Sequence, residues 1–108
     1  MARELNRGEI WLYTFKPPDK RRPVLIISRQ AAIRFLRTVV VAPVTSTIHG
    51  SPAEVEVGFD EGLKHRSAVN LDHIQTVDRS LLRQFVGTVD AGTMRKVCRA
   101  VAVATGCG

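Results

Sequence analysis

Two polar residues stand next to the most apolar segments of the chain. Arg22 directly precedes Pro23 in "RRPVLIIS", and proline favours an extended backbone in the residue before it. Thr45 closes the second apolar run, "VVVAPVTS". If these segments are paired strands, an arginine fork and a hydroxyl meet at one edge of a sheet, where both can bind a phosphate. The alternative is a solvated strand end at Arg22 and a turn capped by Thr45.

Other catalytic patterns are missing from the sequence. It contains no glycine-rich phosphate loop and no Gly-x-Ser-x-Gly. Its histidines, His49, His65 and His73, are 16 and 8 residues apart and have no carboxylates at metal-ligand spacing. A metal-dependent hydrolase is therefore not expected, and we predict no metal and no other cofactor. Phosphoryl chemistry would have to use protein side chains.

The positive charge is concentrated in the first third of the chain. Residues 1–37 hold nine bases and three acids, a net charge of +6, and the remaining seven bases and seven acids cancel. Such an asymmetry favours an anionic partner, nucleic acid first. A solvated basic surface is the alternative.

The elements that must position Arg22 and Thr45 are short strands. The prolines in residues 16–22 predict a loop there. Pro43 predicts that the strand at 38–46 is bulged or ends at that residue. A parallel α/β fold would need a helix after each strand, and these helices are missing. The pattern predicts a mainly β fold with α, a small and strongly curved barrel. We expect strands at 9–15, 23–28, 38–46, 53–58, 67–78 (one bent strand or two short ones) and 84–89, a short helix or loop at 29–37 and a helical turn at 79–82.

The last segment has the clearest helical pattern. Asp90 is the expected N-cap and Gly106 the expected end. Cys98 falls on the apolar stripe and is expected in the core, whereas Cys107 is expected at a frayed end, and no disulfide is predicted. The helix is apolar on more than one stripe, so a partner subunit is expected to cover part of it. The expected core-facing residues are Met94, Val97, Cys98, Val101 and Thr105.

The length of 108 residues predicts one domain, residues 1–108. The longest apolar runs, Val24–Ile27 and Val39–Val44, are too short to span a membrane. The N-terminus carries charges where a secretory signal would be apolar. We therefore expect a cytoplasmic protein without a membrane partner.

Four motifs, in this order, make the sequence similar to a known family: "RGEIWL", "RRPVLIIS", "VVVAPVTS" and "DHIQTVD". They resemble the MazF/PemK/Kid toxins of bacterial type II toxin–antitoxin systems, and the likeness runs from about Arg7 to the C-terminal helix. The resemblance implies a homodimer of SH3-like β-barrels with a C-terminal helix. It also implies a sequence-specific, metal-independent endoribonuclease that cleaves single-stranded mRNA and so stops translation and growth. A cognate acidic antitoxin would block the active site with its C-terminal tail.

The resemblance also assigns roles to individual residues. The arginine and threonine usually treated as catalytic in this family fall on Arg22 and Thr45. Asp72 takes the place of an aspartate that acts as a base in the Kid branch, and Asn70 replaces an arginine proposed as its acid. The loop before Arg22 is shorter than in typical members and lacks their loop histidine or serine. These departures leave the general acid open.

His73, which replaces a common glutamine, is a second candidate for proton transfer, because imidazole exchanges protons near neutral pH. A strand residue bonded to a neighbour is the alternative for His73. The implied reaction is attack by the ribose 2′-OH, which gives a 2′,3′-cyclic phosphate and a 5′-OH, with Arg22 stabilising the charge on phosphorus. The residues expected to bind RNA are Lys16, Lys20, Arg21, Ser46, Thr47, His49, Asn70 and Gln75.

Two other functions are compatible with such a barrel. One is a module that binds nucleic acid without cutting it. The other is a toxin directed against a protein, because the gyrase poison CcdB shares this fold.

Overall fold

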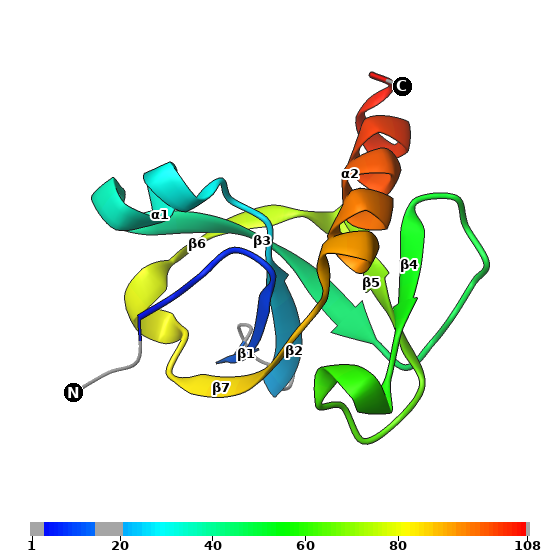
Figure 1. Cartoon of the computed structure of the whole chain (residues 1–108), viewed down its shortest axis with the longest axis horizontal. Helices are drawn as coiled ribbons and strands as arrows, with labels where there is room; N and C mark the ends of the chain where they lie inside the picture. The colour runs from blue at the N-terminus through cyan, green and yellow to red at the C-terminus, as the bar shows by residue number, and fades with distance from the viewer. Residues whose placement is uncertain (1–3, 15–20, 108) are drawn as a thin grey trace.

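A computed structural model of the chain describes residues 4–14 and 21–107, so the predicted RNA contacts Lys16 and Lys20 lie outside the described residues. Seven strands come before a long C-terminal helix (Figure 1). The strands are β1 Glu9–Thr14, β2 Arg21–Ile26, β3 Thr38–Thr45, β4 Glu54–Val57, β5 Ser67–Asn70, β6 Gln75–Asp78 and β7 Gln84–Thr88. The helices are α1 Gln30–Phe35 and α2 Ala91–Thr105, with 3₁₀ turns η1 Phe59–Glu61, η2 Leu71–His73 and η3 Arg79–Leu81.

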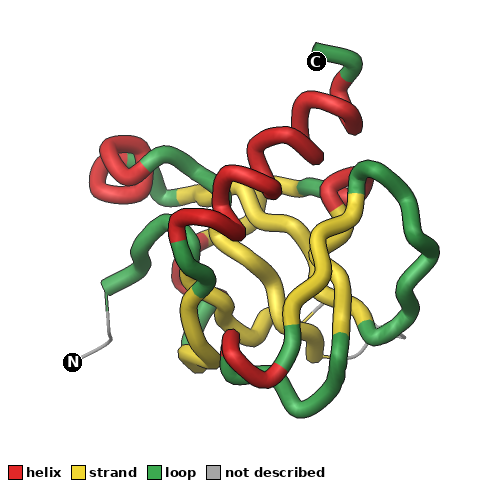
Figure 2. The backbone as a smooth tube through the Cα atoms, turned by 45° about the vertical axis from the view of Figure 1, so that its right-hand side comes forward, coloured by secondary structure: helices red, strands yellow, loops and turns green. Residues whose placement is uncertain are grey.

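All strand pairs are antiparallel. The strands lie in the order β4-β5-β3-β2-β1-β7, and β6 also pairs with β3. The sheet curls on itself, and α2 lies across one of its open sides (Figures 1 and 2). The predicted fold class, mainly β with a small curled sheet and a C-terminal helix, is confirmed. No helix in the described part of the chain is long and apolar enough to cross a membrane.

Both faces of β2 are buried, which explains its unbroken apolar run. Leu25 belongs to the core cluster that α2 closes with Val97. Val24 and Ile26 point to the other face and join a second cluster around Trp11. Because successive side chains of a strand alternate between faces, a strand covered on both sides needs apolar residues at every position.

Strand β3 continues through Pro43, where the sequence predicted a bulge or an end. One edge of β3 pairs with β2 through Val41 to Pro43. Its other edge pairs with β6 as far as Val41 and with β5 from Val44 onward. Pro43 lies between these two partners, where its missing N–H interrupts no ladder. The proline therefore marks the point at which β3 changes partner.

The other boundaries agree with the prediction to within one or two residues. Residues 67–78 form two short strands separated by η2, one of the two predicted arrangements. Arg21 and Arg22, the last two residues of the predicted loop at 16–22, belong to β2 and pair with Thr14 and Tyr13 of β1, and residues 16–20 lie outside the described residues.

Helix α2 has the predicted caps. The N–H of Thr93 donates to Asp90 Oδ1 at 2.7 Å, and Gly106 ends the helix with φ 74°. The prediction that Cys98 is a core residue is wrong: Cys98 is exposed, and the buried residues of α2 are Val97 and Ala100. The core-facing stripe is rotated toward Val97, so that Cys98 faces the N-terminal segment and contacts the guanidinium of Arg7. Two other residues of the predicted stripe, Met94 and Val101, are half-buried, whereas Thr105 is exposed, as is Cys107 at the C-terminal end.

Candidate active site

The two strands that carry Arg22 and Thr45 are paired. The register of β2 and β3 sets Val24 opposite Pro43 and Leu25 opposite Ala42. Continued by two residues, the same register sets Arg22 opposite Thr45. The sequence condition for a phosphate-binding pair, two antiparallel neighbours ending at one edge, is therefore met.

Arg22 and Thr45 line one cleft of about 690 Å³, which we call the Arg22–Thr45 cleft. Its lining residues come from the start of β2, the tip of β3, the segment after η1 and β7. One part of its lining is basic, with Arg21 beside Arg22, and the turn after β3 contributes hydroxyls. The remaining lining residues are Leu12, Pro23, Val44, Ser46, Thr47, Gly62, Leu63, Lys64, His65, Ser67, Gln84, Phe85 and Val86.

The hydroxyl of Thr45 is held in place by the turn that follows β3. Thr45 Oγ1 accepts from the N–H of Thr47 at 2.9 Å and donates to the carbonyl of Thr47 at 3.1 Å. Thr45 thus caps a turn and also lines the cleft, so the two readings of its sequence position are compatible. The same turn keeps Ser46 and Thr47 on the cleft.

Gln84 reaches the cleft from β7, and no sequence pattern predicts it. Arg21 Nη2 donates to Gln84 Oε1 at 2.6 Å. Strands β2 and β7 are not neighbours but flank β1, where Thr14 pairs with Arg21 and Leu12 pairs with Gln84. This bond therefore spans β1 at the cleft edge, and only the strand order reveals it.

A further wall of the cleft, the segment between η1 and β5, is packed against β7. Gly62 has φ +88°, and a Cβ built on it would lie 2.5 Å from the carbonyl oxygen of Val86. A Cβ built on Gly87 would overlap the carbonyl oxygen of Glu61. Both positions therefore require glycine, because any side chain would push the two backbones apart. Lys64 and His65, which sequence reasoning did not select, follow this contact and line the cleft.

The other predicted site residues lie elsewhere. Asn70 caps η2: its Oδ1 accepts from the N–H of Asp72 at 3.0 Å, and its Nδ2 lies 3.2 Å from His73 Nδ1. These three residues form a local group at the end of β5 and do not line the Arg22–Thr45 cleft. The bond between His73 and Asn70 matches the alternative reading of His73 as a residue bonded to a neighbour.

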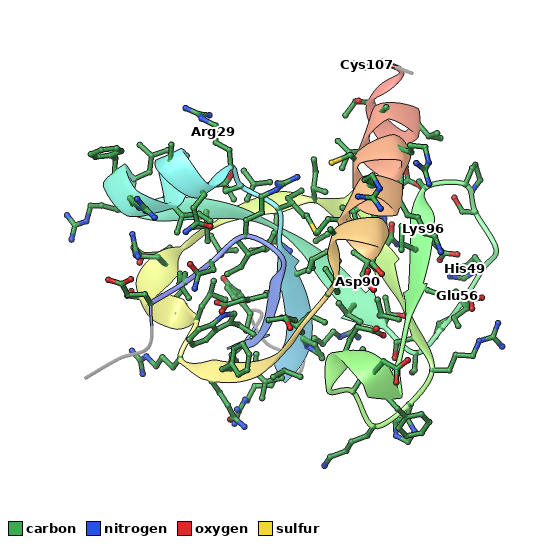
Figure 3. The ribbon with its side chains drawn as sticks, in the orientation of Figure 1. Arg29, His49, Glu56, Asp90, Lys96 and Cys107 are labelled. Carbon is green, nitrogen blue, oxygen red and sulfur yellow. The ribbon has the colours of Figure 1, made fainter. Side chains whose placement is uncertain are left out.

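Gln75 and His49 are also apart from the cleft lining. Gln75 pairs with Val41, four residues before Thr45 along β3. His49 lies on the outer loop between β3 and β4, where its N–H donates to Glu54 Oε1 at 3.1 Å (Figure 3). Of the described predicted site residues, the structure thus brings Arg21, Arg22, Thr45, Ser46 and Thr47 together.

Comparison with known proteins finds a family and relatives that match nearly the whole chain. Residues 6–105 match the family described as PemK-like, MazF-like toxin of type II toxin–antitoxin system. A probable endoribonuclease MazF5 of Mycobacterium tuberculosis is 43% identical over 103 residues, which cover 94% of this chain and 93% of the relative.

Two solved structures extend the similarity to the fold. The Mycobacterium tuberculosis toxin MazF-mt6 matches with a TM-score of 0.85 and 31% identity, over 93% of this chain and 98% of that one. An endoribonuclease from a mycobacterial species, solved in complex with its cognate antitoxin, matches with a TM-score of 0.87 and 30% identity, over 96% and 97% of the two chains. The predicted family is thereby confirmed: this chain belongs to the PemK-like, MazF-like toxins of type II toxin–antitoxin systems.

Proposed function

We propose that this toxin cleaves single-stranded RNA at the Arg22–Thr45 cleft, without a metal ion. Its class of activity, endoribonuclease toxin, follows from the family and from relatives that carry that name. The observation that supports this site is that Arg22 and Thr45, on neighbouring antiparallel strands, both line one cleft whose lining also contains Arg21 and Lys64.

The proposed reaction uses the ribose 2′-OH as the nucleophile. Its attack on the adjacent phosphorus breaks the bond to the 5′ oxygen and gives a 2′,3′-cyclic phosphate and a 5′-OH. Negative charge grows on the phosphorus oxygens during this step. Arg22 offers them a planar fork of N–H donors, and a preorganised donor of this kind contributes about 10²–10³ in rate. Thr45 holds a non-bridging oxygen by turning its hydroxyl from the carbonyl of Thr47 to the phosphate.

Substrate binding involves the remaining polar residues of the cleft. Arg21 attracts the RNA backbone, and Ser46 and Thr47 supply hydroxyl and backbone donors beside Thr45. The amide of Gln84 can pair with a base edge. Roles for Asp72, His73, Asn70, Gln75 and His49 stay predictions from the sequence, because these residues lie outside the cleft lining.

An antitoxin is the expected protein partner, as the relative solved with its cognate antitoxin supports. We assign the blocking interaction to an acidic C-terminal antitoxin tail, since a basic cleft attracts carboxylates for the same reason that it attracts phosphates. A homodimer is the expected assembly. The outer face of α2 supports it, because Val103 is half exposed there at 50%.

The proposal is tested by incubating the purified protein with a long mRNA in EDTA and mapping the new ends. We expect cleavage at a defined sequence, with cyclic phosphate and 5′-OH termini. Arg22→Ala and Thr45→Ala should each lower the rate at least about tenfold without changing the circular dichroism spectrum. Intact RNA at every sequence would refute the nuclease, loss of cleavage in EDTA would refute the metal-free reaction, and wild-type rates in both variants would refute the site.

A further inference from the structure

Among the described residues that line the Arg22–Thr45 cleft, one has a side chain suited to proton transfer. Among the described residues that line it there is no Asp, Glu, Tyr or Cys. The other charged residues of this lining are Arg21, Arg22 and Lys64, and arginine and lysine are residue types whose ordinary role in a site is to supply positive charge. His65 alone carries a side chain of a type that both gives and takes a proton near pH 7. The reaction proposed above needs such a group, since the 5′ oxygen is a poor leaving group unless it is protonated.

The backbone around His65 is fixed at several points. Before it, Gly62 packs directly on β7 and Leu63 is buried. After it, Ser67 Oγ donates to the carbonyl of His65 at 3.0 Å. A residue that acts on a reacting atom has to be held in this way by its neighbours.

Arg66 anchors the same segment on its other side. Its guanidinium forms a two-pronged interaction with Glu56 of β4, with Nη2 at 2.7 Å from Oε1 and Nε at 3.2 Å from Oε2. The two neighbours of Arg66 in the chain, His65 and Ser67, line the cleft, whereas Arg66 itself does not. Arg66 is thus held toward β4 while His65 stays on the cleft.

We propose that His65 donates the proton to the leaving 5′ oxygen, an inference that rests on the proposed function. In this step the 2′ oxygen forms a bond to phosphorus, the bond from phosphorus to the 5′ oxygen breaks, and the imidazolium proton passes to that oxygen. The 2′ proton goes to water, and neutral His65 takes a proton back from solvent before the next turnover. Arg22 and Thr45 keep their roles at the non-bridging oxygens.

A substrate whose leaving group needs no proton isolates this role. Once the cleaved sequence is mapped, two short RNAs are made with that sequence, one with the natural 5′ oxygen at the scissile linkage and one with a bridging 5′ sulfur. A thiolate departs without protonation. His65→Gln should therefore slow cleavage of the oxygen linkage by about 10²–10⁴ and leave cleavage of the sulfur linkage within a few-fold of wild type.

The rates of His65→Gln on the two linkages decide whether His65 is the general acid. An equal loss on both linkages would overturn the role of general acid, and so would an unchanged rate on the oxygen linkage. Activity on the sulfur linkage also shows that the variant is folded. If His65→Gln does not fold, His65→Ala with added imidazole takes its place, and a failure of imidazole to restore cleavage of the oxygen linkage counts against the proposal.

The matched control is Lys96→Gln, which removes an exposed basic side chain on α2 (Figure 3). It should cleave both linkages at the wild-type rate. If the wild-type protein leaves the long mRNA intact, no cleaved sequence can be mapped and the proposed function as a whole is refuted, which separates that failure from the failure of His65 alone.

Discussion

At the scale of single residues, Arg22 and Thr45 offer a phosphate two different kinds of donor. The guanidinium presents two parallel N–H groups to two oxygens, whereas a lysine ammonium presents a point charge. We therefore expect Arg22→Lys to keep RNA binding within a few-fold of wild type and to lower the cleavage rate at least about tenfold. Cleavage kinetics in EDTA and fluorescence anisotropy on a 2′-deoxy substrate analogue measure the two quantities separately. A lysine variant with the full rate would mean that charge alone is needed.

Some residues of the cleft could be predicted from the sequence and others could not. Arg22 and Thr45 were predictable because each lies next to an apolar run, so that pairing of the runs brings them together. His65 and Gln84 were missed because they reach the cleft from segments that the strand order alone makes neighbours. Asp72, placed in the site by resemblance, belongs to a 3₁₀ turn whose direction is set by its Asn70 cap and by packing against α2.

At the scale of elements, the contact between η1 and β7 shapes the cleft. We expect Gly87→Ala to lower the free energy of unfolding by about 1–3 kcal/mol, because its Cβ would overlap the Glu61 carbonyl and the two backbones would have to separate. Cleavage should fall as well, since the segment that carries His65 follows η1. Thermal and urea unfolding, together with RNA cleavage, measure both effects.

Gly92→Ala is the control for this change. Its Cβ would meet only ordinary contacts, the nearest being Asp90 Oδ1 at 3.5 Å, and alanine favours a helix. This variant should be as stable as wild type or slightly more stable, with unchanged cleavage. Equal stability of Gly87→Ala and wild type would show that the η1–β7 contact has room for a side chain.

The cap of α2 predicts a dependence of stability on pH. The backbone N–H of Thr93 donates to the carboxylate of Asp90 and holds its pKa below the usual value. Because the folded state resists protonation of this group, its contribution to stability is complete above the ordinary carboxyl pKa of about 3.9 and is lost as the pH falls through the lower folded pKa.

Asp90→Asn tests this assignment, since asparagine also caps helices but does not titrate. The difference in melting temperature between wild type and this variant should be constant from pH 7 to pH 5 and should shift against wild type below about pH 4. The other carboxylates titrate in both proteins and cancel in the difference. A difference that stays constant down to the acid limit of folding would rule out a charged cap.

At the scale of the whole molecule, the fold class was predictable and the way the sheet closes was not. Apolar runs, turn residues and the missing helices between strands predict a curled β fold with a terminal helix. The exchange of partners on one edge of β3, from β6 to β5, depends on pairing between residues 23 to 40 positions apart, from Thr45 with Ala68 to Thr38 with Asp78, and only the folded chain shows it. That exchange brings the start of β5 beside Thr45, where Ala68 is its partner, and so completes the cleft.

The concentration of positive charge in the first third of the chain predicts how RNA binding responds to salt. If Lys16, Lys20 and Arg21 each contact a phosphate, the logarithm of affinity should fall with the logarithm of salt concentration with a slope of about −2, taking about −0.7 per contact for a single strand.

Arg21→Gln should reduce the size of this slope by about 0.7 and weaken binding similarly for every RNA sequence. Lys96→Gln, on the exposed side of α2, should leave the slope unchanged. Anisotropy titrations of a 2′-deoxy analogue at several salt concentrations give these slopes. A slope near zero would mean that the basic segment does not contact the RNA backbone. An unchanged slope in Arg21→Gln would mean that Arg21, which donates to Gln84 at the cleft edge, does not contact a phosphate.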